Sequence, residues 1–384
     1  MPIEGELIVR LDRDGRHLRR VTVRVTRPTA AARVLTGRSA VNAAATVPLL
    51  YSLCGHAQGA AAASALAAAG ARDVRGHPAC HDDAVLLESV QDTFRHLLID
   101  GPDAMGGAPC AAPVAAARAA IAPYLRATCG STAVGDAGAK HALALHVSGI
   151  AAEAIFGMPV AQWRALNGAE ALLTWCAGGR TVVASALAGI FADEPMLGRS
   201  AVPPMPPARP DALLEIVVPA MRGDAAFERA PTWAGTPVET GALPRMRDDH
   251  LVADVQRRFG NAVGTRMVAR LAELAAQIEE LSGTATGPVS PSRIQAIALG
   301  DGEGLAAVET ARGLLLHRAR VRAERVVDYQ IVAPTEWNFH PEGALPRGLE
   351  GLELDDDVHL SRAARLAVHA LDPCVGSRIE VGHA

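Results

Sequence analysis

Two cysteines of the sequence, Cys54 and Cys374, stand in contexts that are typical of metal ligands, and they lie near opposite ends of the chain. Three residues after each, where a Cys-x-x-Cys pair would have its second cysteine, stand Ala57 and Ser377. A thiolate suits a soft metal, whereas alanine cannot ligate and a serine hydroxyl is a poor soft-metal ligand. The spacing therefore predicts at most a two-thiolate site. The alternative for Cys54, which the spacing alone favours, is a thiol packed in the core.

The residues after Cys54 predict a helix that begins there and runs to Ala69. The positive end of a helix lowers the pKa of a thiol, so we expect Cys54 to ionise readily. His56 is a possible additional ligand, although a lone histidine is more often a satisfied polar residue. The other cysteines have no metal-like spacing and are interpreted as small core residues: Cys80, Cys110, Cys129 and Cys176.

The composition excludes several classes of protein. The 384 residues include 37 basic and 41 acidic side chains, and no cluster of arginines is long enough to indicate nucleic-acid binding. The N-terminus lacks the apolar segment of a secretory signal. The most apolar run, residues 59–70, is shorter than the ~20 residues needed to span a bilayer. We therefore predict a cytoplasmic protein with no membrane or nucleic-acid partner, and six cysteines without disulfide spacing fit a reducing compartment.

The elements that must position the cysteines are mainly helical. Aromatic residues make up only 3% of the chain, so the core must consist of Ala, Leu and Val, which favours closely packed helices. We predict a mainly α fold with small β elements (α+β). Alternation predicts a hairpin over residues 5–26 that turns at Gly15. The other expected elements are helices over 38–70 (interrupted at 54–55), 82–100, 255–281 and 360–370, and strands over 314–317 and 326–332.

Two glycines lie four residues apart within the predicted 255–281 helix. Gly260 and Gly264 would either let another helix approach closely or only weaken this one.

Two stretches without clear periodicity permit a division into domains. Residues 196–210 form a proline-rich connector, and residues 229–244 resemble a loop. A site that uses both Cys54 and Cys374 requires the two ends of the chain to meet. We therefore predict a single domain over residues 1–384.

Several segments resemble, in the same order, those of the large subunit of [NiFe] hydrogenases. They are Pro2-Ile3-Glu4-Gly5, Cys54-Gly55, Glu88 to Asp100, Glu309-Thr310-Ala311-Arg312-Gly313, Val332 to Asn338 and His369-Ala370-Leu371-Asp372-Pro373-Cys374. Each segment alone is a weak signal, but the shared order is a strong one. Residues 105–290 carry little that can be aligned. The resemblance implies a large-subunit-like helical core with an N-terminal hairpin and a small C-terminal sheet.

The resemblance also implies which metal chemistry is lost. In the large subunit two Cys-x-x-Cys pairs bind nickel, and the second cysteine of each pair also bridges to iron. Cys54 and Cys374 match the terminal nickel ligands, whereas Ala57 and Ser377 occupy the bridging positions. No nickel is therefore expected. This combination resembles the HupK/HoxV group of hydrogenase accessory proteins, which implies a non-catalytic scaffold and not an enzyme.

The cargo implied by this resemblance is an Fe(CN)2(CO) unit, or iron, bound transiently by Cys54 and Cys374. Low-spin iron that already carries cyanides and carbonyl needs few protein donors, and two thiolates release it more easily than four. The implied partners are hydrogenase maturation factors (the iron–cyanide assembly complex and its small chaperone) and the apo hydrogenase large subunit.

Three further residues match positions that surround the iron in the large subunit. Arg312 matches the arginine beside the cyanides, and a guanidinium suits an anionic cyanide nitrogen as a hydrogen-bond donor. Pro334 and Thr335 match the residues that face the other cyanide. Without the resemblance, a surface arginine and a turn at a strand end are the preferred interpretations. Glu4 matches a proton-relaying glutamate and is interpreted here as a structural remnant or as a hydrogen-bond acceptor in the wall of the site.

Two other functions remain open. The alternatives to the scaffold are a divergent hydrogenase-like redox subunit and a metal-free structural relative of the large subunit. The missing bridging cysteines argue against the first, and the joint retention of Cys54, Cys374 and Arg312 argues against the second.

Overall fold

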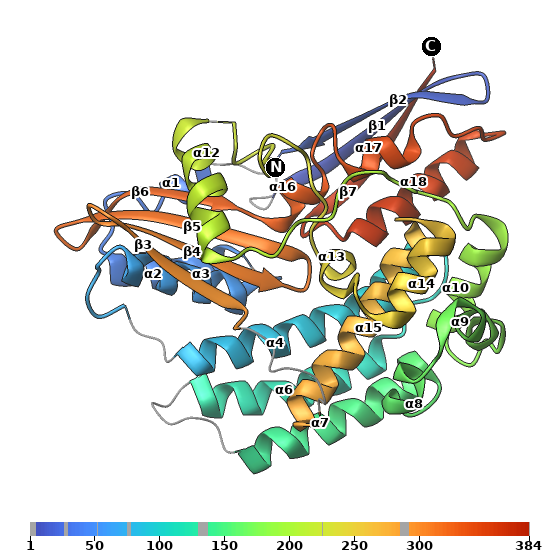
Figure 1. Ribbon diagram of the computed structural model, residues 1–384, viewed down its shortest axis with the longest axis horizontal. Coiled ribbons are helices and arrows are strands. Elements are labelled where there is room, and N and C mark those ends of the chain that lie inside the picture. The colour runs from blue at the N-terminus through green and yellow to red at the C-terminus, as the bar shows by residue number, and fades with distance from the viewer. Residues whose placement is uncertain are drawn as a thin grey trace.

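The computed structural model describes residues 5–26, 30–51, 53–74, 78–129, 137–224, 226–284 and 292–383. These residues form a mainly helical α+β fold, as the sequence predicts. Figure 1 shows a helical body, a four-stranded sheet beside it, and a second sheet at the top of the view that contains the C-terminal strand.

The helices lie throughout the chain. In chain order they are α1 (Ala30–Arg33), α2 (Ala40–Leu50), α3 (Gly55–Ala68), α4 (Pro78–Arg95) with a π-helical continuation (His96–Asp100), α5 (Gly101–Ala104), α6 (Ala111–Cys129), α7 (Ala137–Ala151) with a π-helical end (Ala152–Phe156), α8 (Val160–Arg164), α9 (Gly168–Ala177), α10 (Val182–Asp193), α11 (Pro210–Ala212) with a π-helical turn (Leu213–Val217), α12 (Val218–Gly223), α13 (Ala242–Met246), α14 (His250–Phe259), α15 (Val263–Ser282), α16 (Pro334–Asn338), α17 (Ala344–Leu349) and α18 (Asp357–Leu371).

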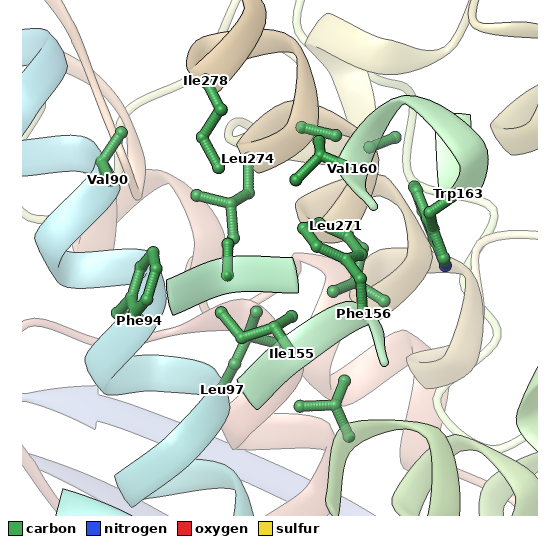
Figure 2. Close-up of a cluster of buried hydrophobic side chains, with 14 of the residues drawn as sticks. Val90, Phe94, Leu97, Ile155, Phe156, Val160, Trp163, Leu271, Leu274 and Ile278 are labelled. Carbon is green, nitrogen blue, oxygen red and sulfur yellow. The ribbon is translucent and has the colours of Figure 1, made fainter. Parts of the chain in front are cut away.

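The helical body is built around α15, which is buried along most of its length. Figure 2 shows its apolar face, with Leu271, Leu274 and Ile278, packed against Phe94 of α4. Trp163 of α8 closes the cluster on the other side and is fully buried. Because its polar residues are buried as well as its apolar face, neighbouring elements must cover α15 on nearly every side.

The single helix predicted over residues 255–281 is wrong. The chain forms two helices there, because α14 ends at Gly260, whose φ of +69° only glycine adopts without strain. Gly264 has the other effect considered for the pair, which is to let another helix approach closely. A Cβ at Gly264 would lie 2.7 Å from the Phe191 ring, so the glycine allows α10 to approach α15 closely.

The four-stranded sheet is an antiparallel meander in the order β3-β4-β5-β6. Its strands are β3 (Ile294–Gly300), β4 (Glu303–Thr310), β5 (Gly313–Arg322) and β6 (Arg325–Val332). The sequence predicted β5 and β6 but missed the first two strands. The alanine-rich helix α3 packs on this sheet, and Gly304 on β4 lies directly under the Ala65 carbonyl, where a side chain would overlap it. Between α3 and this sheet, close packing of small residues thus takes the place of large aromatic side chains.

The second sheet joins the two ends of the chain. β1 (Glu6–Asp14) pairs antiparallel with β2 (His17–Val25) through the predicted turn, in which Gly15 has a φ of +56°. β1 also pairs in parallel with β7 (Gly376–His383), a strand that the sequence did not predict. This pairing fixes residues 376–383 beside the N-terminal hairpin and so positions the nearby Cys374.

The chain between α10 and α11 has almost no regular secondary structure. Residues 194–209 contain no helix or strand apart from single bridges at Ser200 and Pro204, which agrees with the predicted connector. In the described part of the chain no single helix is long and apolar enough to cross a bilayer, and α9 and α10 pass that test only when taken together across a bend of 116°.

Candidate metal centre

Cys54 is the N-cap residue of α3, as the sequence predicts, and its side chain is half-buried. The first turn of α3 is fixed by a carboxylate from another helix. Glu88 of α4 accepts hydrogen bonds from the N–H groups of His56 and Ala57, at 2.8 Å each. Because the first N–H groups of a helix need external acceptors, Glu88 determines where α3 starts and thereby where Cys54 lies. Nothing in the sequence predicts this role of Glu88, because an acidic residue on a distant helix carries no local signal for it.

Cys374 lies just after α18 and is held by Thr335. Thr335 Oγ1 accepts a hydrogen bond from Cys374 N–H at 3.1 Å and lies 2.9 Å from Cys374 Sγ. Thr335 is buried at the start of α16, directly after Pro334. Because the hydroxyl hydrogen is not used by the amide contact, it can be donated to a thiolate at Cys374. The fold thus brings Thr335, with Pro334 directly before it in the chain, into contact with Cys374.

The prediction that Cys54 ionises readily is wrong for the metal-free protein. Burial, the charge of Cys374 and the carboxylate of Glu88 raise the pKa of the Cys54 thiol, in that order of importance, and Arg312 opposes them only in part. Desolvation and negative neighbours outweigh the helix terminus. The same interactions show that Cys54, Cys374 and Arg312 lie within electrostatic reach of one another. Since a metal ion binds the thiolate, we expect metal binding at Cys54 to release a proton.

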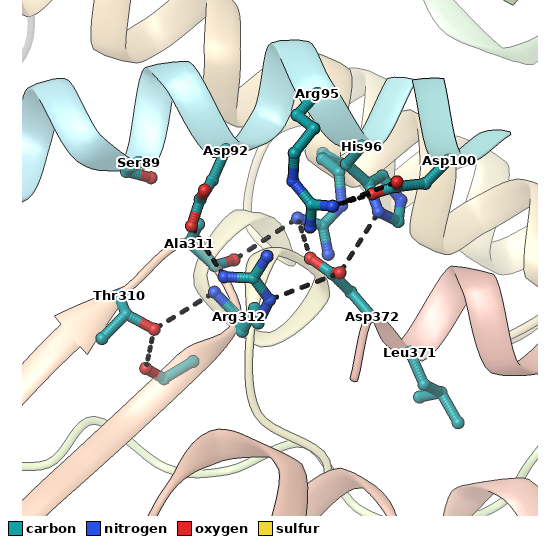
Figure 3. A network of polar contacts seen from close by, with 12 residues as sticks. Ser89, Asp92, Arg95, His96, Asp100, Thr310, Ala311, Arg312, Leu371 and Asp372 are labelled. Atoms are coloured by element: carbon teal, nitrogen blue, oxygen red, sulfur yellow. Dashed lines mark hydrogen bonds and ion pairs between the residues drawn. The ribbon is translucent and has the colours of Figure 1, made fainter. Parts of the chain in front are cut away.

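Arg312 lies in the turn between β4 and β5 and is only 3% exposed. Its Nη1 donates to Asp92 Oδ2 at 2.7 Å, and its Nε lies 3.4 Å from Asp372 Oδ1. Figure 3 shows the guanidinium between Asp92, which points down from α4, and Asp372, at the end of α18. Burial lowers the pKa of Arg312, but the charges of the two aspartates and of the two cysteines outweigh burial and raise it well above its ordinary value. The arginine is therefore a permanent buried cation and not a surface residue.

Two donor groups of Arg312, Nε and Nη2, have no hydrogen-bond partner among the described residues, although Nε lies 3.4 Å from Asp372 Oδ1. Its Nη2 is buried and unpaired. A buried donor without an acceptor costs free energy, so it marks a position where a bound acceptor is favoured. A cyanide nitrogen is an acceptor of this kind, and its negative charge suits a guanidinium. The donor set fits the predicted cargo, since it combines two soft sulfurs with a free cationic N–H.

Asp372 is the centre of a buried ion cluster that also contains Arg270 of α15 and His96. Asp372 Oδ2 lies 3.1 Å from Arg270 Nη1, and Oδ1 lies 3.3 Å from His96 Nδ1. Burial raises the pKa of Asp372, but Arg312, His96 and Arg270 outweigh burial and hold it well below its usual range. Two elements far apart in sequence, α4 and α15, therefore anchor the segment that carries Cys374. The sequence pattern suggested none of these partners.

A second buried polar contact anchors α3 to the four-stranded sheet. His317 of β5 is fully buried, with its ring nitrogens 2.9 Å from Gln58 Oε1 and 2.8 Å from the Tyr329 hydroxyl. The amide oxygen is an acceptor only, so Nε2–H donates to Gln58 and the tyrosine hydroxyl donates to Nδ1. Gln58 lies one turn after Cys54, and its N–H donates to the Cys54 carbonyl. The neutral imidazole thus holds the turn that begins at Cys54.

This contact makes the stability of the protein depend on pH. Burial lowers the pKa of His317 to about 3. The unfolded chain takes up a proton near pH 6.5 and the native ring does not, so stability falls as the pH falls from 6.5 towards 3, by up to about 1.4 kcal/mol per pH unit. The free energy of unfolding of the wild type and of His317→Gln can be measured in urea at pH 7 and at pH 4. Between these two pH values we expect the variant to lose about 3 kcal/mol less of this free energy than the wild type loses. The exposed His146→Gln should leave the wild-type pH dependence unchanged, and equal pH dependence in all three proteins would contradict the assignment.

Other residues considered for the site do not join it. Ala57 is packed in the core at 1% exposure, and Ser377 is an exposed residue of β7 opposite Leu7. The His56 side chain is exposed. Glu4 lies outside the described residues, as do the side chains of Cys80 and Cys129. Cys176 is buried in the helical body and Cys110 packs against it, both as free thiols, which confirms the interpretation of these two as core residues.

The described residues contain no group of three or more His, Cys, Asp or Glu side chains that could hold a metal ion. Two thiols alone leave most coordination positions of an iron atom to other donors. A metal unit that brings its own ligands is therefore better suited to this centre than a bare ion.

Comparison with protein families gives a match to the nickel-dependent hydrogenases over residues 247–379. Over most of its length the chain is similar to the hydrogenase expression/formation protein HoxV of Cupriavidus necator, with 32% identity over 92% of this chain and 91% of that protein. It is also similar to the hydrogenase expression/formation protein HupK of Rhizobium leguminosarum bv. viciae, with 28% identity over 95% and 93% of the two chains.

Solved structures show the same fold. The Ni-Fe-Se hydrogenase from D. vulgaris Hildenborough aligns with a TM-score of 0.64 over 94% of both chains, at 17% identity. The enzyme from Desulfomicrobium baculatum aligns with a TM-score of 0.64 over 95% of both chains, at 15% identity. These alignments confirm the predicted large-subunit-like fold.

Proposed function

The chain belongs to the family of hydrogenase expression/formation proteins that includes HoxV, and from this premise we propose that it is a non-catalytic scaffold in hydrogenase maturation. Its cargo is an Fe(CN)2(CO) unit. Cys54 and Cys374 hold this unit, or the unit is assembled on them, before it is transferred to the apo large subunit. The relatives are named for the expression or formation of hydrogenase, which supports a maturation role.

The observation that supports the proposal is the unpaired Nη2 of Arg312, whose guanidinium lies within electrostatic reach of the two thiols. A guanidinium held by Asp92 and Asp372 is already neutralised, so it needs no further carboxylate. What it lacks is an acceptor for one N–H pair. Cyanide ligands supply such acceptors, and water or a bare cation supplies neither a fixed position nor a negative charge.

The residues act on the cargo by holding it. Each thiol loses its proton to become a soft donor, and the Thr335 hydroxyl donates to the Cys374 sulfur and stabilises its negative charge. Arg312 orients the unit by a charge-assisted hydrogen bond. Because only two protein sulfurs bind the unit here, its transfer to a four-cysteine site on the recipient is favourable in free energy. The proposed partners are accordingly the iron–cyanide assembly complex, its small chaperone and the apo large subunit, and the proposed location is the cytoplasm.

Catalysis is not part of the proposal, because the positions that bridge nickel and iron in the large subunit are a buried alanine and an exposed serine. Ala57 is packed among the core residues of α3 and β5, and Ser377 is a strand residue. Neither position offers a sulfur that could place a second metal beside the first.

Infrared spectroscopy of the full chain tests the proposal. We expect protein purified natively from a maturation-competent host to show cyanide and carbonyl bands, to contain iron and to lack stoichiometric nickel. The same protein from a host without hydrogenase maturation factors should show no bands. Stoichiometric nickel with hydrogen-linked dye reduction would establish the redox-enzyme alternative. Absence of bands from both hosts would instead support the metal-free structural alternative.

A further inference from the structure

A cavity whose lining does not include the cysteines lies next to the turn that carries Arg312. It has a volume of about 420 Å3, within the range of small-ligand pockets. Its walls come from α13 and the residues after it, α15, and the start of β3 and end of β4. Thr310 belongs to its wall and accepts a hydrogen bond from Arg312 N–H, so one residue separates this cavity from the metal centre.

The charged residues of the wall leave an excess of negative charge. Arg245 is bound by Glu273, at 2.5 and 3.0 Å, and also by Glu309 at 2.7 Å. Arg293 is bound by Glu280, at 2.9 and 2.6 Å, and its backbone N–H donates to Asp82 at 2.7 Å. Arg247 also lines the cavity, and its Nε lies 3.6 Å from Asp248 Oδ2. The wall thus has three arginines, each already engaged, and one carboxylate more than that: Asp248, Glu273, Glu280 and Glu309. The wall therefore attracts cations and has little to offer an anion.

The wall also contains hydrogen-bond acceptors without donors. Gln277 is only 7% exposed, and its amide nitrogen donates to Ser89 Oγ at 3.0 Å. Its Oε1 has no hydrogen-bond partner among the described residues, and the same holds for Oε1 of Gln295. A buried amide oxygen without a donor favours a ligand that carries N–H groups.

The rim of the cavity is apolar. Met205, Pro206 and Pro207 of the connector line it on one side, and Pro244 and Met246 line it on another. Apolar contacts of this kind suit the methylene stem of a long cationic side chain, whose charged end then reaches the polar floor.

We propose that this cavity binds an alkyl cation with several N–H donors, the guanidinium or ammonium group of an arginine or lysine side chain or of a free small amine. The negative wall selects the charge, the unpaired amide oxygens of Gln277 and Gln295 select the N–H donors, and the apolar rim selects the stem. The inference goes beyond the proposed iron-holding role. Because the cavity wall includes neither Cys54 nor Cys374, loss of infrared bands and loss of cation binding are separate outcomes.

Titration of the full chain with matched small probes tests the proposal. N-acetyl-arginine amide is expected to bind saturably, as followed by ligand-observed NMR. N-acetyl-citrulline amide, which has nearly the same shape without the charge, should bind at least about tenfold more weakly, because it lacks the charge-assisted contacts. The arginine affinity should fall as the salt concentration rises. Equal binding of the two probes, or no saturable binding of either, would overturn the proposal.

Two variants locate the binding and one serves as control. Glu309→Gln removes a wall charge but keeps an acceptor for Arg245, and Gln277→Leu removes the unpaired acceptor; each should weaken the arginine probe about tenfold. Glu279→Gln removes the same charge from a neighbouring position on α15 that does not line the cavity, and should change nothing. If Glu309→Gln does not fold, the affinity of Gln277→Leu for the arginine probe still tests whether the probe binds in this cavity. An equal loss in the Glu279 variant would mean that binding follows overall charge, and would overturn the proposal.

Two further probes distinguish the source of the cation. Agmatine carries the guanidinium without peptide groups, and the blocked tripeptide Ala-Arg-Ala adds them on both sides. Tighter binding of the tripeptide would identify a side chain on a partner protein as the ligand. Equal or tighter binding of agmatine would identify a free amine. Both outcomes support the proposed chemistry.

Discussion

Replacing Cys54 or Cys374 by alanine is expected to reduce the cyanide and carbonyl infrared bands of the natively purified protein at least about tenfold, because each removes one of two proposed sulfur ligands. Even loss of an outer contact to a metal ligand costs 10–100-fold in affinity, and loss of a ligand should cost no less. The measurement is infrared absorbance per mole of protein, with maturation of the served hydrogenase as a second readout.

The matched control is Cys110→Ala. Cys110 is a free thiol of similar half-buried exposure, but it packs against the helical body and not at the proposed centre. Its bands should equal those of the wild type. Undiminished bands in both Cys54→Ala and Cys374→Ala would show that the diatomic-ligated iron is bound elsewhere, and the proposed ligand set would be abandoned.

Loading of iron on Cys54 should also depend on pH. Burial and negative neighbours raise the pKa of this thiol, so the metal must displace a proton that the metal-free protein binds tightly. Iron retention should therefore decrease as the pH is lowered.

Asp372→Asn is expected to lower the free energy of unfolding by about 3–5 kcal/mol, the usual effect of breaking a buried ion pair. Asp372 is 4% exposed and faces three cationic or polar partners, Arg312, Arg270 and His96. An asparagine leaves the two guanidinium groups buried with one compensating charge fewer. Urea unfolding at pH 7 measures the effect as a lower midpoint at an unchanged slope.

The control for this prediction lies at the other end of the same helix. Asp357 pairs with Arg13 and His383, but its side chain is 45% exposed, so Asp357→Asn should cost much less stability than Asp372→Asn. Similar losses in the two variants would show that burial does not strengthen the Asp372 cluster. Because the pKa of Asp372 is held below its usual range, its contribution is present above about pH 4 and is lost as the pH falls further.

Much of the fold could be predicted from local patterns. Alternation and a glycine turn identified the hairpin of β1 and β2, and helical periodicity identified α3 starting at Cys54 and α18 ending before Cys374. The requirement that both cysteines share one site predicted that the chain ends meet, and β1 and β7 do pair. This pairing supports the proposal of one domain over residues 1–384.

Elements whose stability comes from distant contacts were missed. β3 and β7 are short strands of modest hydrophobicity that exist because β4 and β1 pair with them. The break at Gly260 was invisible to periodicity, because α14 and α15 are both amphipathic and continue in similar register. Tertiary pairing, and not propensity, decided these cases.

The sequence by itself determined which chemical groups are available. They are the first cysteine of each of two Cys-x-x-Cys pairs that lack the second cysteine, an arginine in the turn before β5, and the Pro334-Thr335 pair. Only the tertiary structure decided their state. A local rule predicted an easily ionised Cys54, but Glu88, Cys374 and burial come from other parts of the chain and reverse that prediction. The same holds for Arg312, which Asp92 and Asp372 fix with one N–H pair left free. Residue types are written in the sequence, whereas charge and desolvation depend on which distant groups the fold brings together.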